Sequence, residues 1–323
     1  MSIKNKSLCI SSAVVLGLGT GWAYAQGAAP AYPSKAVRIV TNTPGGSTDL
    51  ASRLIAQGVT AALGQPVIIE NRPAIVLVEI VSKAQPDGYT VLVESGTLWI
   101  APFLQKVPYD PIKDFSPITL LTRAPNLLVV HPSLAAHSVK ELIALAKAKP
   151  GALNYASSTA GSSNHLAGEM LNAMAGIKIV RVPYNGTGPA LNGVIGGDVQ
   201  MLFANAAAGM PHVKSARLRA LGVASEKPSP LAPGLPTLSA SGLPGFVAVT
   251  TNGMWAPART ATPIVRRLNQ EIVKFLNSAE ARDKFLNAGF ETVANSPEEA
   301  VAEIKTDMAR MSKVIKDAGI KSE

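Results

Sequence analysis

The feature that most constrains the fold is an alternation of short β-rich runs with helical patterns along almost the whole chain. The β-rich runs are apolar and β-branched, and amphipathic stretches of helical length separate them. This alternation predicts an α/β fold with largely parallel sheets. We expect strands at residues 37–43, 67–70, 90–94, 118–121, 127–130, 153–157, 178–182, 199–204, 219–224 and 247–251.

The helix ends are marked by capping residues. Ser138 with Glu141, and Ser296 with Glu299, have the spacing of a capping box. Prolines suit the first turn of a helix and glycines suit its end. Such prolines occur at 189, 263 and 297, and such glycines at 64, 151, 289 and 319.

The N-terminal segment has the order of a secretory signal peptide. Lys4 and Lys6 precede the apolar stretch 8–18, and Ala23 and Ala25 place small residues before a cut. The apolar stretch is too short to span a bilayer as a helix. We therefore expect residues 1–25 to be removed and the mature protein to be exported to the periplasm. Cleavage also removes Cys9, the single cysteine, which excludes disulfides and thiol catalysis.

The net charge favours acidic ligands. It is +9 for the whole chain and +7 (30 − 2 − 21) without Lys4 and Lys6. The basic residues are dispersed and aromatic residues make up 5% of the chain, so neither a basic stripe nor a stacking platform for nucleic acid is expected. A basic surface that only aids solubility is the alternative explanation of most of these charges.

The length of the mature chain predicts two lobes, because nearly 300 residues (323 − 25 = 298) exceed one compact core. The segments 123–132 and 250–257 combine an apolar extended run with Pro or Gly, as in a two-strand hinge. The first lobe is then discontinuous, formed by residues 26–125 and 252–323, with 126–251 as the second lobe. Such folds bind ligands in the cleft, at the carboxyl ends of strands.

Three segments follow an expected strand and precede an expected helix, where free backbone N–H groups and the helix dipole favour an anion. In the first, Pro44-Gly45-Gly46 frees the backbone; the alternative is a tight turn in which Asp49 only caps a helix. The second, 153–165, offers several hydroxyl donors, and the third is 182–189. The candidate ligand-binding residues are Thr43, Pro44, Gly45, Gly46, Ser47, Thr48, Asp49, Ser157, Thr159, Ala160, Gly161, Ser162, Ser163, His165, Tyr184, Gly186, Thr187 and Asn205.

Several ordered motifs span the mature chain. They are Tyr32–Lys35, Pro44–Gly46 with Asp49 and Arg53, Glu70–Pro73, Pro86–Thr90, Pro108–Pro111 with Asp114 and Phe115, Tyr155–Ser157, Gly161-Ser162, His165–Glu169, Val182–Tyr184 with Gly186, and Gly196-Gly197. Together they resemble the Bug-type, TctC-like extracytoplasmic solute receptors of tripartite tricarboxylate transporters.

The resemblance implies a type II periplasmic-binding-protein-like fold, with two α/β lobes, each a sheet flanked by helices, that close on a ligand. It implies a monomer that captures a di- or tricarboxylate, an acidic amino acid or an aromatic acid and delivers it to a membrane permease. It also implies that the turn 44–49 and the loop 157–165 are the two halves of the carboxylate site. Such sites often bind through backbone amides and bridging waters, which agrees with the absence of a paired arginine clamp.

The sequence departs from the family pattern at four places. Thr43 stands where an aromatic residue usually precedes Pro-Gly-Gly, which implies a more polar and roomier cleft wall. After Pro73 the run 74–79 replaces a glycine-rich helix start and is about three residues shorter, so this loop should contribute less backbone to the ligand. Thr251 and Met311 stand where tryptophans are common. These departures weaken any transfer of substrate identity.

An exported serine hydrolase is the alternative function. Residues 161–165 differ in one position from the G-x-S-x-G nucleophile elbow, with Ser163 as the nucleophile, but His165 replaces the final glycine that the strained turn needs. No P-loop, no G-x-G-x-x-G after a strand and no H-E-x-x-H occurs, and the four histidines lack metal-ligand spacing. We therefore expect no metal, no cofactor and no enzymatic activity.

Overall fold

The computed structural model describes Met1, residues 32–317 and residues 319–320. The expected signal peptide, 1–25, lies outside the described residues apart from Met1. The strands are β1 (Val37–Thr41), β2 (Val67–Asn71), β3 (Thr90–Ser95), β4 (Phe115–Val130), β5 (Asn154–Ser157), β6 (Val180–Pro183), β7 (Met201–Asn205), β8 (Arg219–Val223), β9 (Val249–Pro257) and β10 (Glu291–Thr292). The helices are α1 (Ser47–Leu63), α2 (Ala74–Ser82), α3 (Thr97–Ile100), η1 (Ala101–Phe103), α4 (Val139–Ala148), α5 (Ser163–Ala175), α6 (Thr187–Gly196), α7 (Ala206–Lys214), α8 (Thr262–Leu276), α9 (Ala279–Asn287) and α10 (Pro297–Asp317).

The strands pair in the order β2-β1-β3-β9-β4-β7-β5-β6, with β8 and β10 also paired to β4. The outer pairs, β1 with β2 and β3 and β5 with β6 and β7, are parallel. The central pairs, β3 with β9 and β4 with β9, β7 and β8, are antiparallel. The prediction of largely parallel sheets is therefore wrong at the centre of the fold.

β4 explains this difference. The sequence predicts two strands, 118–121 and 127–130, but Phe115–Val130 forms one strand. Its first part pairs with β9 from Phe115↔Pro257 to Pro125↔Val249, and its last part pairs with β7 and β8. Both β4 and β9 are extended along the segments that the sequence assigned to the hinge, so β4 is shared by the two halves of the sheet.

Each half of the sheet is buried on both faces. In the first half, Ile39 and Val91 contribute to one apolar cluster and their chain neighbours Val40 and Leu92 to another. The second half is buried in the same way, because Leu128 and Val130 contribute to one apolar cluster and Leu127 and Val129 to another. Residues of period two point to opposite faces, so a strand covered on both sides is apolar throughout. The two-lobed α/β fold predicted from the sequence is confirmed.

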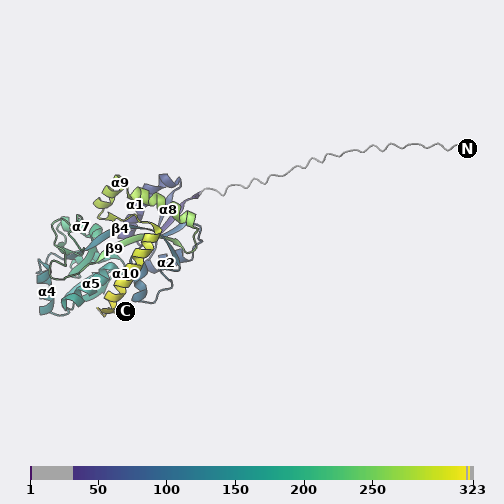
Figure 1. Cartoon of the computed structure of the whole chain (residues 1–323). Helices are drawn as coiled ribbons and strands as arrows, with labels where there is room; N and C mark the ends of the chain where they lie inside the picture. The colour runs from purple at the N-terminus through teal and green to yellow at the C-terminus, as the bar shows by residue number, and fades with distance from the viewer. Residues whose placement is uncertain (2–31, 318, 321–323) are drawn as a thin grey trace. The chain divides into compact units, whose positions relative to one another are not determined.

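The helices cover these faces by lobe. Helices α1, α8 and α9 pack on one face of the first half, and α2, α3 and α10 on the other. Figure 1 shows α1, α8 and α9 together, α4 and α5 away from them in the second lobe, and α10 running along β4. The C-terminal helix also contacts the second lobe, because Val314 packs against the cluster that contains α4 and α5.

One predicted capping box forms in full and the other forms in part. In the second box, Glu299 N donates to Ser296 Oγ at 3.2 Å and Ser296 N donates to Glu299 Oε2 at 2.8 Å. In the first, Glu141 N donates to Ser138 Oγ at 3.2 Å, while Glu141 Oε2 accepts from the backbone of the preceding residue, His137. These contacts satisfy N–H groups that a helix start leaves free.

Candidate functional site

A cleft of about 430 Å³ lies between the two lobes and contains residues from both. The predicted residues that line it are Thr43, Pro44, Gly46, Ser47, Thr48, Thr159, Ser162, Ser163, Gly186, Thr187 and Asn205. The predicted residues outside the lining are Gly45, Asp49, Ser157, Ala160, Gly161, His165 and Tyr184. The structure thus brings the three predicted segments to one cavity, with part of each segment turned away from it.

The first wall is the turn between β1 and α1. Gly45 has φ +87°, a backbone conformation that residues with a Cβ rarely adopt, whereas Gly46 has φ −89° and caps α1 in an extended conformation. A Cβ on Gly46 would meet no atom closer than 3.9 Å within the protein. The positive φ at position 45 therefore requires glycine. At position 46, the missing side chain leaves space open at the cleft.

Asp49 holds this turn from behind. Its Oδ2 accepts from Gly45 N at 3.2 Å and from Arg53 Nε at 3.2 Å, and its Oδ1 accepts from Asn71 Nδ2 at 2.8 Å. Burial acts to raise the pKa of Asp49, but the hydrogen bonds from Arg53, Asn71 and Gly45 and the charge of Arg53 lower it overall. Asp49 is therefore a carboxylate neutralised by Arg53, and it positions the turn without facing the cleft.

The opposite wall is the loop between β5 and α5. Ser162 caps α5, and Asn164 Oδ1 accepts from Ser158 N at 3.1 Å, Ser158 Oγ at 3.0 Å and Ser162 Oγ at 2.5 Å. Ser157 is buried and accepts from Arg181 Nε at 2.7 Å. The hydroxyls of Ser157, Ser158 and Ser162 therefore hold the loop in shape, although Ser158 and Ser162 also line the cleft with Thr159 and Ser163.

His165 supports this loop from within the protein. It is buried, and its Nδ1 accepts from Gly161 N at 3.1 Å. Burial, with a smaller contribution from the charge of Arg181, lowers the pKa of His165 to about 4. The ring is therefore neutral near pH 7, as its acceptor role requires, and it stabilises the Gly161 turn, whose φ is +82°.

Ser163 has a different partner from the one that a nucleophile needs. Its Oγ lies 2.7 Å from Thr250 Oγ1 on β9, and Thr250 Oγ1 in turn lies 3.3 Å from Asn126 Oδ1 on β4. A serine nucleophile needs a base in contact with its hydroxyl. Among the described residues, Thr250 is the side-chain partner of the Ser163 hydroxyl. The interpretation of 161–165 as a nucleophile elbow therefore lacks the general base that the serine needs.

The third predicted segment, 182–189, forms the wall of the cleft near Thr43. A Cβ on Gly186 would lie 3.6 Å from Thr43 Oγ1, which shows how near these two walls are. Tyr184 lies outside the lining, and its ring occupies the space beside Gly193, where a Cβ would lie 2.3 Å from the Tyr184 hydroxyl. Asn205 caps α7 by accepting from Ala208 N at 2.9 Å.

Sequence reasoning missed much of the lining. The residues outside the three predicted segments are Asn42, Pro73, Glu94, Ser95, Thr97, Asn126, Phe203 and Thr250, while Ser158, Asn164, Asn185, Gly188 and Pro189 lie within those segments but were not among the candidate residues. Several of them are polar residues at the end of a strand, such as Glu94 and Ser95 after the apolar run 91–93. This change from apolar to polar residues at the carboxyl end of a strand is the signal that could have found them. In the described part of the chain, Glu94 is the only lining residue with an ionisable carboxyl, and no Lys, Arg or His lines the cleft.

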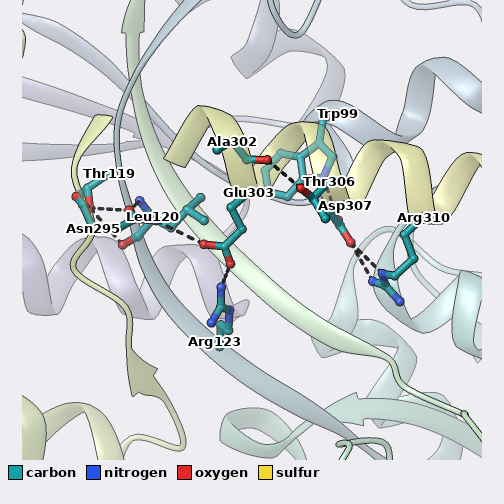
Figure 2. Close-up of polar contacts among 10 residues, drawn as sticks. All are labelled: Trp99, Thr119, Leu120, Arg123, Asn295, Ala302, Glu303, Thr306, Asp307 and Arg310. Carbon is teal, nitrogen blue, oxygen red and sulfur yellow. Dashed lines mark hydrogen bonds and ion pairs between the residues drawn. The ribbon is translucent and has the colours of Figure 1, made fainter. Parts of the chain in front are cut away.

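A second cavity of about 280 Å³ shares Ser95, Thr97, Ser163 and Thr250 with the cleft, and both Thr251 and Met311 line it. Figure 2 shows its charged wall, where Arg123 of β4 forms an ion pair with Glu303 of α10. Asp307 of α10 accepts from Trp99 Nε1 at 2.8 Å and from Arg310 at 2.7 Å. Because these charges are paired within the protein, they hold α10 in place, and the cleft is the better ligand site.

Neither a membrane-spanning helix nor a metal site is found among the described residues. No helix in this part of the chain is long and apolar enough to cross a membrane. No group of three or more His, Cys, Asp or Glu side chains is arranged there to hold a metal ion.

Comparison with known proteins identifies the family. Residues 51–320 match the model of the family described as "TctC: Tripartite tricarboxylate transporter family receptor". The structure described as "R. palustris Rpa4515 with adipate" is 34% identical, with a TM-score of 0.88 over 90% of this chain and 100% of that chain. The periplasmic binding protein BugD is 30% identical, with a TM-score of 0.86 over 90% and 100%. MatC (Rpa3494) from Rhodopseudomonas palustris, with bound malate, is 28% identical, with a TM-score of 0.83 over 88% and 100%. These likenesses confirm the periplasmic-binding-protein fold, and the chain belongs to the TctC family of tripartite tricarboxylate transporter receptors.

Proposed function

We propose that this protein is a periplasmic receptor that captures a small carboxylate in the cleft between its lobes. The observation that carries the proposal is the convergence of two helix-start segments from different lobes, 44–48 and 159–163, on one cavity. Each offers backbone N–H groups and hydroxyl donors near the positive end of a helix dipole. Similar proteins solved with adipate and with malate support the ligand class.

The chemistry of the cleft wall fits binding without catalysis. The hydroxyls of Ser47, Thr48 and Thr159 are neutral donors, which can hold a carboxylate without a buried countercharge. Donors from both lobes reach one ligand together only when the cleft is closed. Binding and closure are therefore coupled, as in other two-lobed receptors.

The proposal includes the cellular setting. Residues 1–25 act as a cleaved signal peptide, the mature protein is a periplasmic monomer with lobes 26–125 plus 252–323 and 126–251, and a membrane permease of a tripartite transporter receives the ligand. The family assignment supports this setting. Mass spectrometry of protein recovered from the periplasm should show a mature start at about Gln26, and retention of Cys9 would contradict it.

A thermal-shift screen of the mature protein against di- and tricarboxylates, acidic amino acids and aromatic acids tests the function. A ligand at 100 times its Kd stabilises the native state by about 2.7 kcal/mol, which gives a readily measured rise in Tm. Neutral amides of the same acids are the control. If no carboxylate raised Tm, or if the amides raised it equally, the receptor function would be wrong.

A further inference from the structure

The cleft contains a buried acidic side chain that a carboxylate receptor does not obviously need. Glu94 is the fifth residue of β3, it is 3% exposed, and it lines the cleft. The strands on either side of β3 are β1 and β9, so Glu94 lies at the centre of the first lobe's half of the sheet. It therefore belongs to the rigid floor of the site rather than to a mobile loop.

The hydrogen-bond partners of Glu94 are all neutral. Asn42 Nδ2 donates to Oε2 at 2.6 Å, and Ser95 donates to Oε1 through its backbone N at 2.8 Å and its hydroxyl at 2.9 Å. No ion pair to Glu94 is recorded in the described part of the chain. Glu70, on β2 of the same lobe, contrasts with it, because Glu70 pairs with Arg38 at 2.8 Å and Arg72 at 2.7 Å.

The surroundings leave the charge of Glu94 uncompensated. The neighbours of Glu94 carry no charge. They are Asn42, which follows β1, Gly253, which pairs with Glu94 on β9, and Thr97 of α3. Tyr109 is a nearby titratable group, and burial together with the charge of Glu94 raises its pKa, so it stays neutral. Burial outweighs the three hydrogen bonds and raises the pKa of Glu94 to about 7. A ligand therefore meets either a carboxylate that accepts hydrogen bonds or a neutral carboxyl that has taken up a proton.

We propose that Glu94 sets the ligand class of the cleft by selecting acids that carry a hydrogen-bond donor, such as a hydroxyl or ammonium group, at the end facing β3. This inference rests on the proposed carboxylate-receptor function. A fully ionised dicarboxylate would place its second charge against Glu94, and like charges in contact weaken binding strongly. Such a ligand binds only with Glu94 protonated, whereas a donor-bearing acid binds the ionised form directly.

Isothermal titration calorimetry with matched acids tests this inference on the mature protein. The probes are adipate, 6-hydroxyhexanoate and 6-aminohexanoate, with succinate, 4-hydroxybutanoate and 4-aminobutanoate as the shorter set. From about pH 5.5 to about pH 8.5 the neutral fraction of Glu94 falls to roughly 3%, so the dicarboxylates should weaken on the order of 30-fold. The hydroxy acids should change by less than about threefold.

Glu94→Gln separates this role from a structural one. The side-chain amide keeps the volume and an acceptor oxygen, and Asn42 can rotate its own amide to keep the contact. In this variant the dicarboxylates should bind about tenfold or more tightly than to the wild type at pH 8.5, with no pH dependence beyond that of their own carboxyl groups, and the ammonium-bearing acids should weaken. Glu70→Gln is the matched control, because Glu70 lies outside the cleft lining, and it should change neither affinity nor its pH dependence.

The outcomes distinguish the two proposals. If the acids bind but Glu94→Gln leaves the preference between adipate and 6-hydroxyhexanoate unchanged at pH 8.5, this inference is wrong and the receptor function stands. If none of these acids nor any other carboxylate binds the wild type, the receptor function itself is wrong, and the selection by Glu94 falls with it.

Discussion

Gly289 lies directly against Ala207, so closely that a Cβ on Gly289 would be 2.3 Å from the Ala207 Cα and 2.5 Å from its backbone nitrogen. Gly289 follows α9 of the first lobe, and Ala207 is the second residue of α7, which packs on the second half of the sheet. The two lobes therefore meet at a point where only glycine leaves enough space. A similar contact exists at Gly161, where a Cβ would lie 3.2 Å from the Ala101 Cα.

Gly289→Ala should therefore hold the lobes apart as well as strain the backbone. A positive φ costs a residue with a Cβ about 1–2 kcal/mol, and here the contact with backbone atoms adds to that cost. Gly64→Ala is the matched control, since Gly64 also has a positive φ but a Cβ there would meet no atom within 4 Å. We expect a larger loss of Tm and of ligand affinity for Gly289→Ala. Equal losses in the two variants would show that the contact is unimportant.

Asp49→Ala should weaken ligand binding although Asp49 lies outside the cleft lining. The change removes the acceptor that orders Gly45 and leaves Asn71 and Arg53 without their shared partner. Loss of hydrogen bonds to a charged group costs about 2 kcal/mol of stability. Urea denaturation and calorimetry measure the two effects. The exposed Asp283→Ala should change neither, and wild-type affinity in Asp49→Ala would contradict a positioning role.

Ser163→Ala separates the receptor from the hydrolase. For a receptor, the variant loses at most one neutral hydrogen bond, about 1 kcal/mol of affinity, together with its contact to Thr250. For a hydrolase, the same variant loses the nucleophile and nearly all turnover. We expect no ester hydrolysis above background in either protein. Wild-type hydrolysis that disappears in Ser163→Ala would overturn the receptor function.

His165 should make stability fall with acid. Its pKa is about 4 in the folded protein against an ordinary value of 6.5, so between these values the unfolded chain binds the proton and the folded one does not. Stability from the neutral ring is therefore full above pH 6.5 and is lost as pH falls towards 4. The loss is on the order of 3 kcal/mol.

His165→Asn tests this pH dependence, because an amide oxygen can still accept from Gly161 N but does not titrate in this range. Glu94 acts in the opposite sense, since its raised pKa favours folding at low pH and this contribution fades between about pH 4.5 and 7. Because Glu94 is present in both proteins, the difference between wild type and variant reports the contribution of His165 to stability. On going from pH 7 to pH 5, the urea midpoint of the wild type should shift towards lower urea relative to that of His165→Asn, and identical shifts in the two proteins would contradict the assignment.

The sequence predicts the strands well because both faces of the sheet are buried, which makes strands such as β1 and β7 mostly apolar. It does not predict the central pairing. Pro117 and Pro125 interrupt the pattern in β4, and nothing local records that β9 pairs with both β3 and β4. The antiparallel centre of the sheet is therefore visible only in the structure.

The same limit applies to the cleft. Turns that contain glycine and follow a strand are visible in the sequence, and Pro44 and Ser163 do reach the lining. Glu94, Asn126 and Thr250 belong to strands whose neighbours are far away in the chain, so their convergence depends on the pairing order. Tyr184 and His165 were predicted to bind the ligand but lie outside the cleft lining. The sequence pattern identifies the segment but does not reveal which of its side chains point into the cleft.

The pairing of Pro125 with Val249 also sets the order in which the lobes are completed during synthesis. The chain after the end of β4 at Val130 returns only at Val249 to β4's neighbour β9, so β5 to β8 are all made before β9 exists. Until then β3 presents an open edge, because its later neighbour is β9. Open strand edges and unfinished domains promote aggregation. Chains that terminate before Val249 should therefore aggregate through β3, whereas the full-length chain covers that edge with β9, which opens its last quarter.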